Sequence, residues 1–260
     1  MSSSKTITKD TINRLLKDVR QIMKHPLTDN NIYYTHDDED ILKGYALIIG
    51  PSETPYFGGY YFFEFNYPYD YPFSPPKVKY MTNDGQTRYN PNLYKCGKVC
   101  VSILNTWSGD KWSACQTINS ILLTLCSLLN DMPFLNEPGQ HPGSRDCVAY
   151  NRSIEYSNIN FAVCEMVNPL KNAVPEQFRG FYPYLKEHFY KNYDQILDFV
   201  VKKKELFEVL TVQIYSMQTY VDYVRLKDKL IETKRILDLD LQKEKDNKKE
   251  KDNKKEKDNK

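Results

Sequence analysis

Residues 32–80 consist of short aromatic and β-branched runs divided by clusters of glycine, proline and aspartate. The three clearest runs cover residues 41–49, 60–65 and 77–80. Runs of this length and composition are typical of β-strands, and the short connections between them suit antiparallel neighbours. We therefore expect a meander that forms a four-stranded antiparallel sheet.

Two stretches with helical periodicity lie on either side of this meander. Residues 11–24 place apolar side chains three and four positions apart, and His25-Pro26 ends that pattern. Residues 113–130 form the clearest buried helix, with an apolar face made of Ile118, Ile121, Leu122, Leu125, Leu128 and Leu129. We expect both helices to back the sheet, so the fold class is α+β.

The chain from Ser144 onward has a helical pattern. Its clearest apolar stripe steps by three and four residues, through Phe207, Leu210, Ile214, Met217, Val221 and Val224. Such a stripe packs on its own domain or on a coiled-coil partner, and we favour the first. The pattern predicts an all-helical extension over residues 144–242, with no strand in it. The extension holds no catalytic candidate, so we expect it to affect partner choice more than chemistry.

Residues 243–260 are three copies of Lys-Glu-Lys-Asp-Asn-Lys, with nothing to bury. This composition predicts a disordered, solvated tail, and an acidic partner for it stays open. The tail holds nine lysines and six acids, so the net charge of +2 for the whole chain leaves the rest slightly acidic. A nucleic-acid-binding domain should be basic without its tail, so nucleic acid is not an expected partner.

The sequence also argues against membrane insertion and secretion. No stretch approaches the roughly 18–20 apolar residues that span a bilayer, and residues 1–20 lack the apolar core of a signal peptide. The six cysteines are therefore expected to be reduced thiols. None forms a Cys-x-x-Cys pair and the four histidines are scattered, so no metal site is predicted. We expect a cytoplasmic protein, with the nucleus left open as a second location.

The segment from Asn83 to Asp110 has little periodicity and many Asn, Gly and Pro residues, which predicts a long ordered loop of a kind that is usually functional. Within it, Pro91-Asn92 stands eight residues before Cys100, which follows Gly-Lys-Val. A cysteine taken alone is usually a small buried apolar residue. In this setting, however, the stretch resembles the active-site segment of the ubiquitin-conjugating enzyme family.

The resemblance runs from Arg14 to about Gly143 in the family's order. Its motifs are a Gly-Pro…Thr-Pro-Tyr-x-Gly-Gly hairpin at residues 50–59, a proline-rich loop at 67–78, and Trp112-Ser113 in place of a Trp-Ser-Pro before a helix. Each motif alone is common, but their order around a cysteine is specific. The resemblance implies a UBC-like catalytic core over residues 1–143.

Several departures indicate a subfamily. The family's usual His-Pro-Asn is Asn90-Pro91-Asn92 here, and four extra residues between Cys100 and Trp112 supply a second tryptophan, Trp107. Asn-Glu-Pro-Gly follows the long helix at residues 136–139, and the likeness continues to roughly residue 192. These features resemble conjugating enzyme Z and the conjugating domain of the giant apoptosis inhibitor Apollon.

The resemblance implies a carrier of ubiquitin or a ubiquitin-like modifier. An activating enzyme delivers the modifier, Cys100 accepts it as a thioester, and a substrate lysine then takes it, usually with a ubiquitin ligase. Cysteine suits this role because sulfur is both a good nucleophile and a good leaving group. No cofactor is expected, since the activating enzyme is the one that uses ATP. The loop carries no histidine to serve as a general base, which argues against a cysteine protease.

Three further residues are candidates for the catalytic site. By resemblance, the Asn92 side-chain amide donates to the oxyanion that forms during transfer, and the alternative is that it braces the loop. Asn136 or Glu137 falls on the far rim of the cleft, where Glu137 can accept hydrogen bonds from the attacking amine. The alternative for this pair is a simple turn. Cys96, only four residues from Cys100, lies where the family varies, so we expect Cys100 to be the sole acceptor.

Partner-binding positions follow from the same resemblance. Ligases are expected at Pro72 and Phe73, beside Ser113 and Ala114, although Ala114 replaces the family's usual proline. The activating enzyme is expected at Arg14 and Lys17 on the first helix, where the alternative is ordinary surface charge. Two competing functions are a catalytically silent adaptor of the same fold and a pure interaction protein. The presence of both Cys100 and Asn92 favours the enzyme.

Overall fold

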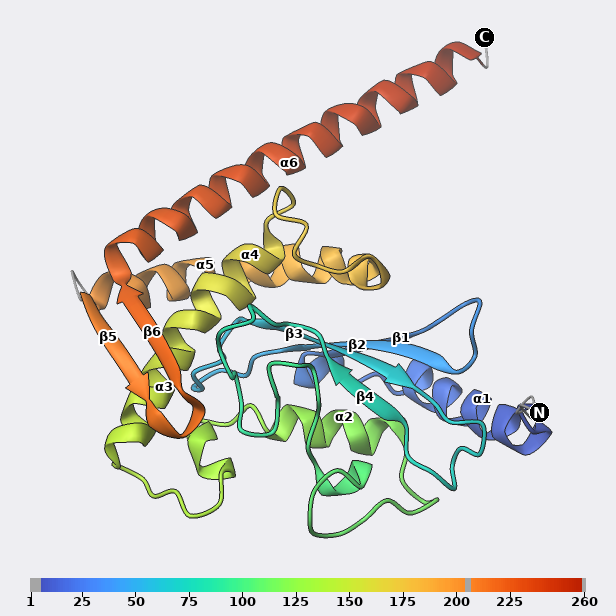
Figure 1. Ribbon diagram of the computed structural model, residues 1–260. Coiled ribbons are helices and arrows are strands. Elements are labelled where there is room, and N and C mark those ends of the chain that lie inside the picture. Colours follow the sequence, from blue (N-terminus) through green and yellow to red (C-terminus); the bar gives the residue numbers. More distant parts are fainter. Residues whose placement is uncertain (1–5, 204–206, 259–260) are drawn as a thin grey trace, which may run out of the picture.

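Four antiparallel strands form the predicted meander, in the order β1-β2-β3-β4 (Figure 1). The structure is a computed structural model that describes residues 6–203 and 207–258, with side chains through residue 246. The strands are β1 (Ile32–His36), β2 (Lys43–Ile49), β3 (Tyr60–Asn66) and β4 (Lys77–Tyr80). The central pair, β2 and β3, is in register through Ala46 opposite Phe63 and Leu47 opposite Phe62. The α+β prediction and the four-stranded sheet are confirmed.

Two helices cover one face of this sheet, as expected. Helix α1 (Lys9–Lys24) begins where the Thr8 side chain accepts a hydrogen bond from the backbone of Thr11. Helix α2 (Ile118–Ser127) is shorter than the predicted stretch, because Thr117 and Ser120 form a capping box that sets its first turn. The apolar face of α2 is fully buried at Ile121, Leu122 and Leu125.

The extension covers the opposite face of the sheet. Its helical elements are α3 (Arg145–Ser157), a π-helical segment (Asn158–Val163), α4 (Cys164–Val167), a 3-10 segment (Glu176–Phe181), α5 (Tyr182–Lys202) and α6 (Tyr223–Asp258). Phe178 packs on the sheet, with its ring centroid 5.0 Å from that of Phe62 and 5.4 Å from that of Tyr45. The sheet is therefore sandwiched between α1 and α2 on one side and the extension on the other (Figure 1).

The prediction of an all-helical extension is wrong at one place. Residues Phe207–Val212 (β5) and Met217–Asp222 (β6) form an antiparallel hairpin, joined by a 3-10 turn at Gln213–Tyr215 and by Ser216 in the left-handed region, with φ 47°. Burial alternates along both strands, whereas Phe207 and Ile214 of the supposed helical stripe are exposed. A period of two, not 3.6, describes this segment.

The charged repeat also differs from its prediction, because the backbone of α6 stays helical to Asp258. Lysine and glutamate are good helix formers, and acids and bases recur three and four positions apart on α6, as in the Lys234–Asp238 ion pair. The last part of α6 projects away from the body (Figure 1). Residues 259–260 of the predicted tail and 1–5 of the predicted core lie outside the described residues.

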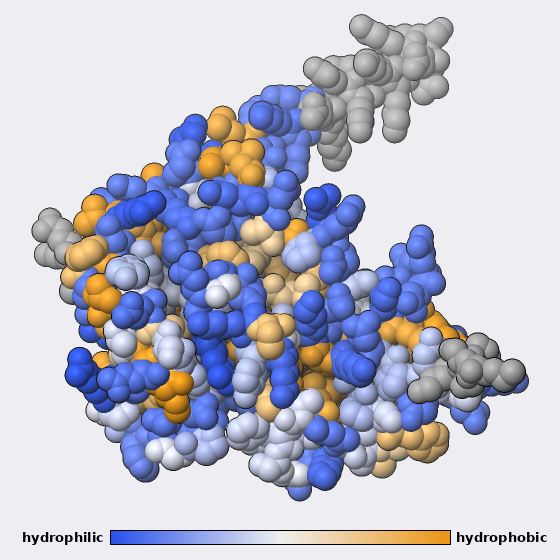
Figure 2. All heavy atoms as spheres, in the orientation of Figure 1, coloured by the Kyte–Doolittle hydropathy of each residue, from blue (hydrophilic) through white to orange (hydrophobic). Residues whose placement is uncertain are grey.

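The surface is mainly hydrophilic on the face that Figure 2 shows, with apolar side chains in small separate groups. Across the described ranges, none of the helices is long and apolar enough to cross a membrane.

Candidate functional site

Cys100 lies at the end of a small hairpin formed by residues 92–100. The turn closes through a hydrogen bond from the Tyr94 amide to the Lys98 carbonyl (2.9 Å), and the Cys100 amide donates to the Asn92 carbonyl (2.9 Å). Gly97 has φ 88°, and a Cβ there would meet the Tyr80 carbonyl oxygen at 2.9 Å, so this position requires glycine. The geometry places Asn92 directly opposite Cys100.

The Asn92 side chain braces this hairpin. Its Nδ2 donates to the Cys100 carbonyl oxygen at 2.6 Å, while its Oδ1 is buried without a hydrogen-bond partner in the described structure. This contact supports the alternative that Asn92 braces the loop. The oxyanion role stays a prediction, and it requires the amide to turn from the backbone carbonyl to the reacting one.

The thiol of Cys100 is covered, with the residue only 3% exposed. Its Sγ donates to the Thr106 carbonyl oxygen at 2.7 Å. Thr106 is itself bound to Val101, whose amide donates to the threonine hydroxyl at 2.9 Å. The loop between Cys100 and Trp112, which contains the four extra residues, thus contacts the Cys100 thiol, and Trp107 in that loop is exposed. Sequence reasoning found the insertion but missed Thr106, since no motif marks it.

Asn90 replaces the family's histidine and is fully buried. Its Nδ2 donates to the Leu128 carbonyl (2.7 Å) and to the Tyr56 hydroxyl (2.9 Å), and its Oδ1 accepts from the Asn92 amide (2.9 Å). An amide offers two donors and an acceptor, so asparagine can tie the loop to α2's end in place of an imidazole. Asn90 therefore gives the loop internal bonding at the position of the family's histidine.

Of the two predicted rim residues, Asn136 contacts this network and Glu137 contacts the extension. Asn136 Nδ2 lies 3.4 Å from Asn90 Oδ1, which ties the 3-10 segment Pro133–Asn136 to the active-site loop. Glu137 Oε2 accepts a 2.6 Å hydrogen bond from the hydroxyl of Tyr215, at the tip of the β5–β6 hairpin. Burial, followed by this bond to Glu137, raises the pKa of the Tyr215 phenol well above its usual range, so it stays a donor.

Tyr215 is the second residue that sequence reasoning missed. It is one of 21 tyrosines, and the hairpin that presents it was taken for a helix. Nothing in the local sequence distinguishes it from the other tyrosines. Only the tertiary structure brings this residue of the extension to Glu137.

The predicted ligase-facing residues lie together on the surface. Trp112 Nε1 donates to the Pro72 carbonyl at 2.7 Å, which places Pro72 and Phe73 beside the exposed Ser113 and Ala114. Phe73 is 79% exposed, an unusual environment for a phenylalanine.

Arg14 and Lys17 differ in their surroundings. The Arg14 guanidinium donates to the Ala114 and Gln116 carbonyls, both at 2.6 Å, and lies 3.0 Å from the Asp18 carboxylate. Arg14 therefore ties α1 to the segment before α2. Lys17 is exposed on α1. Docking of an activating enzyme at these two positions stays a prediction.

A four-stranded meander that follows α1 and precedes α2 in the chain, with a cysteine at the end of the hairpin after β4, is the arrangement of a ubiquitin-conjugating domain. The family model described as ubiquitin-conjugating enzyme matches residues 14–155, and the chain belongs to this family. The resemblance predicted from the motifs is confirmed.

Comparison with three relatives identifies the subfamily within this family. The chain is 42% identical to human ubiquitin-conjugating enzyme E2 Z over 186 residues, which cover 70% of this chain and 50% of that protein. Against the Xenopus tropicalis E2 Z it is 36% identical over 230 residues, covering 83% and 72%. Against the human dual E2 ubiquitin-conjugating enzyme/E3 ubiquitin-protein ligase BIRC6 it is 37% identical over 206 residues, covering 75% and 4%. The predicted subfamily is thus confirmed, while the chain spans about half the length of the human E2 Z.

Proposed function

We propose that the protein is an active ubiquitin-conjugating enzyme that carries ubiquitin or a ubiquitin-like modifier as a thioester on Cys100. The observation that supports this most directly is the hairpin of residues 92–100, which holds Cys100 opposite Asn92 inside a domain of the family. In the first step the Cys100 thiolate attacks the thioester carbonyl that joins the modifier to the activating enzyme. A new carbon–sulfur bond forms and the activating enzyme's cysteine leaves as a thiolate.

The covered thiol sets a condition on this step. The hydrogen bond from Cys100 Sγ to the Thr106 carbonyl has to break, and the loop that holds Thr106 has to move, before the sulfur reaches a carbonyl carbon. The burial of this thiol also favours one competing function, that of a catalytically silent adaptor, because a thiol that never becomes exposed cannot accept a modifier.

In the second step a lysine amine attacks the thioester, forms an isopeptide bond and releases the Cys100 thiolate. Negative charge builds on the carbonyl oxygen, and the Asn92 amide is a side-chain donor already bonded to the Cys100 backbone. A well-placed donor of this kind lowers the barrier by about 2.7–4 kcal/mol. The amine loses a proton on attack. Desolvation near the site lowers its pKa and Glu137 accepts its hydrogen bonds.

The partners that belong to this proposal are the modifier, its activating enzyme, a ligase and substrate lysines. No cofactor is required of this chain, because ATP is consumed by the activating enzyme. A cytoplasmic or nuclear location is part of the same proposal, since the reaction requires a reduced thiol.

The deciding experiment incubates the purified protein with ATP and ubiquitin, or with each of a panel of ubiquitin-like modifiers, together with the matching activating enzyme. We expect an adduct with at least one modifier on a non-reducing gel, and its disappearance with reducing agent. Absence of an adduct with every pair tested, from a protein shown to be folded, would favour the silent adaptor.

Phe73 provides a test of the ligase surface. We expect Phe73→Ala to leave thioester formation unchanged and to lower ligase-stimulated transfer by at least about tenfold, because exposed aromatic anchors carry much of the free energy of binding at interfaces. The measurement is discharge of the preformed thioester with and without a RING-type ligase that stimulates the wild type. Leu170→Ala is the matched control, since Leu170 is also exposed but lies in the extension. Full stimulation of the Phe73 variant would contradict the prediction.

A further inference from the structure

The β5–β6 hairpin brings the extension into contact with the active-site region. Its inner face is buried through Leu210, Val212 and Met217, and Glu208 pairs with Arg152 of α3. At the tip, the Tyr215 ring packs against Phe134 and Tyr150, with ring centroids 5.9 and 5.7 Å away. These contacts hold the tip in place against the segment that precedes Glu137.

Through its hydroxyl, Tyr215 holds the predicted rim residue. The 2.6 Å bond to Glu137 Oε2 is a hydrogen bond to an acidic side chain, of the kind that is shorter and stronger than a bond between neutral groups. It occupies one carboxylate oxygen, and no hydrogen bond to Oε1 is recorded among the described residues. Glu137 is half-buried, so its second oxygen is the one left to meet an incoming amine.

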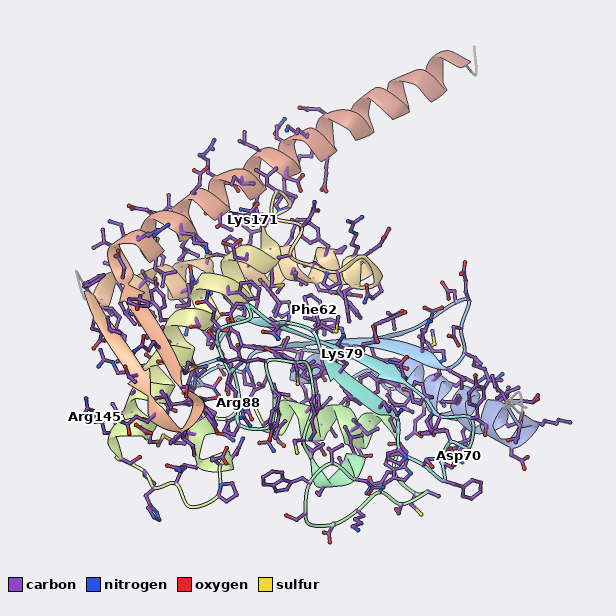
Figure 3. The ribbon with its side chains drawn as sticks, viewed as in Figure 1. Phe62, Asp70, Lys79, Arg88, Arg145 and Lys171 are labelled. Carbon is purple, nitrogen blue, oxygen red and sulfur yellow. The ribbon has the colours of Figure 1, made fainter. Side chains whose placement is uncertain are left out.

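Through its ring, Tyr215 also supports the hairpin that carries the nucleophile. The Arg88 guanidinium lies between two tyrosines, with Cζ 4.4 Å from the ring centroid of Tyr215 and 3.9 Å from that of Tyr94. Arg88 donates to the Pro91 carbonyl, directly before Asn92. Figure 3 shows Arg88 next to the hairpin tip. One side chain of the extension therefore contacts Glu137 through its hydroxyl and, through its ring, the Arg88 side chain that lies on Tyr94 of the 92–100 hairpin.

We propose that Tyr215 is a positioning residue for transfer of the modifier to lysine. Its hydroxyl orients Glu137 toward the attacking amine. Its ring holds the Arg88 guanidinium against Tyr94, which belongs to the 92–100 hairpin. This inference rests on the proposed function and gives the extension a part in the chemistry, whereas the sequence predicted that the extension affects partner choice more than chemistry.

The test uses the full chain and measures charging, which is formation of the thioester, separately from discharge, which is transfer of the modifier to lysine. Tyr215→Phe removes the hydroxyl and keeps the ring on Arg88. We expect its thioester to form at the wild-type rate. After the activating enzyme is quenched, we expect the thioester to discharge to free lysine about tenfold more slowly than the wild type at saturating lysine. This is the size expected from losing a hydrogen bond to a charged group. Tyr220→Phe is the matched control, because Tyr220 lies exposed on the same hairpin. We expect it to discharge like the wild type.

A double-mutant comparison distinguishes positioning from a structural role. If Tyr215 acts through Glu137, Tyr215→Phe slows discharge in the wild type and causes no further slowing in a Glu137→Ala background. Thermal unfolding of each variant is recorded alongside. Equal slowing in both backgrounds, slowing that follows the unfolding temperature, or no slowing in either background would overturn the proposal. Failure of the wild type to charge would instead overturn the proposed function, so the two failures are distinguishable.

Discussion

Replacing Cys100 with alanine abolishes the thiol-sensitive adduct, and replacing Cys96 leaves it nearly unchanged; this is the result we expect from a non-reducing gel with activating enzyme, ATP and modifier. The thioester needs a sulfur that can come close to the Asn92 amide. Among the described cysteines only Cys100 is hydrogen-bonded to Asn92, donating from its backbone amide to the Asn92 carbonyl and accepting from the Asn92 side-chain amide. The expected effect is complete, since alanine offers no nucleophile.

Cys100→Ser extends this prediction. A hydroxyl is a weaker nucleophile and a poorer leaving group than a thiol, so we expect an adduct that forms more slowly and survives reducing agent as an oxyester. Cys96 and Cys115 are the controls that test this assignment most strictly, because both thiols are exposed while Cys100 is buried. An adduct that persists on the alanine variant, or that is lost when Cys96 is changed, contradicts the assignment of Cys100.

The core of the fold could be predicted because its local signals agree with one another. Proline and glycine clusters separate the strands, and the apolar face of α2 keeps a helical period over its whole length. The motif around Cys100 could likewise be recognised by its resemblance to the family's active-site segment. Gly97 and the Asn92–Cys100 hydrogen bond require a fixed number of residues in the hairpin, so the spacing of the motif is constrained. Where local and tertiary preferences coincide, sequence patterns are informative.

The β5–β6 hairpin shows why the rest could not be predicted. Its apolar residues fit helical and strand spacing alike, and its turn uses Ser216 in the left-handed region instead of the glycine or asparagine that marks most such turns. Packing against α3 decides the outcome, and that information is not local. The role of Tyr215 was hidden for the same reason, since its partners Glu137 and Arg88 lie 78 and 127 positions earlier in the chain.

The extension covers the second face of the sheet, and a substitution at this contact has the other large effect that we expect. Phe178 is 0% exposed, and its ring contacts those of Phe62, Tyr45 and Phe181. Phe178→Ala removes a large buried side chain at the junction of the core and the extension. We expect it to lower the free energy of unfolding by about 3–5 kcal/mol, because the loss of buried apolar surface adds to the cost of the cavity left behind.

Phe207→Ala is the matched control for this change, since Phe207 belongs to the same extension but is 71% exposed. A surface substitution of this kind should change the free energy of unfolding by less than about 0.5 kcal/mol. Denaturant titration of the full chain measures both variants, with the slope of each transition checked against the wild type. A Phe178 variant as stable as the Phe207 variant would mean that the extension does not contribute to the core. The extension would then be a separate unit, and the predicted core of residues 1–143 would fold without it.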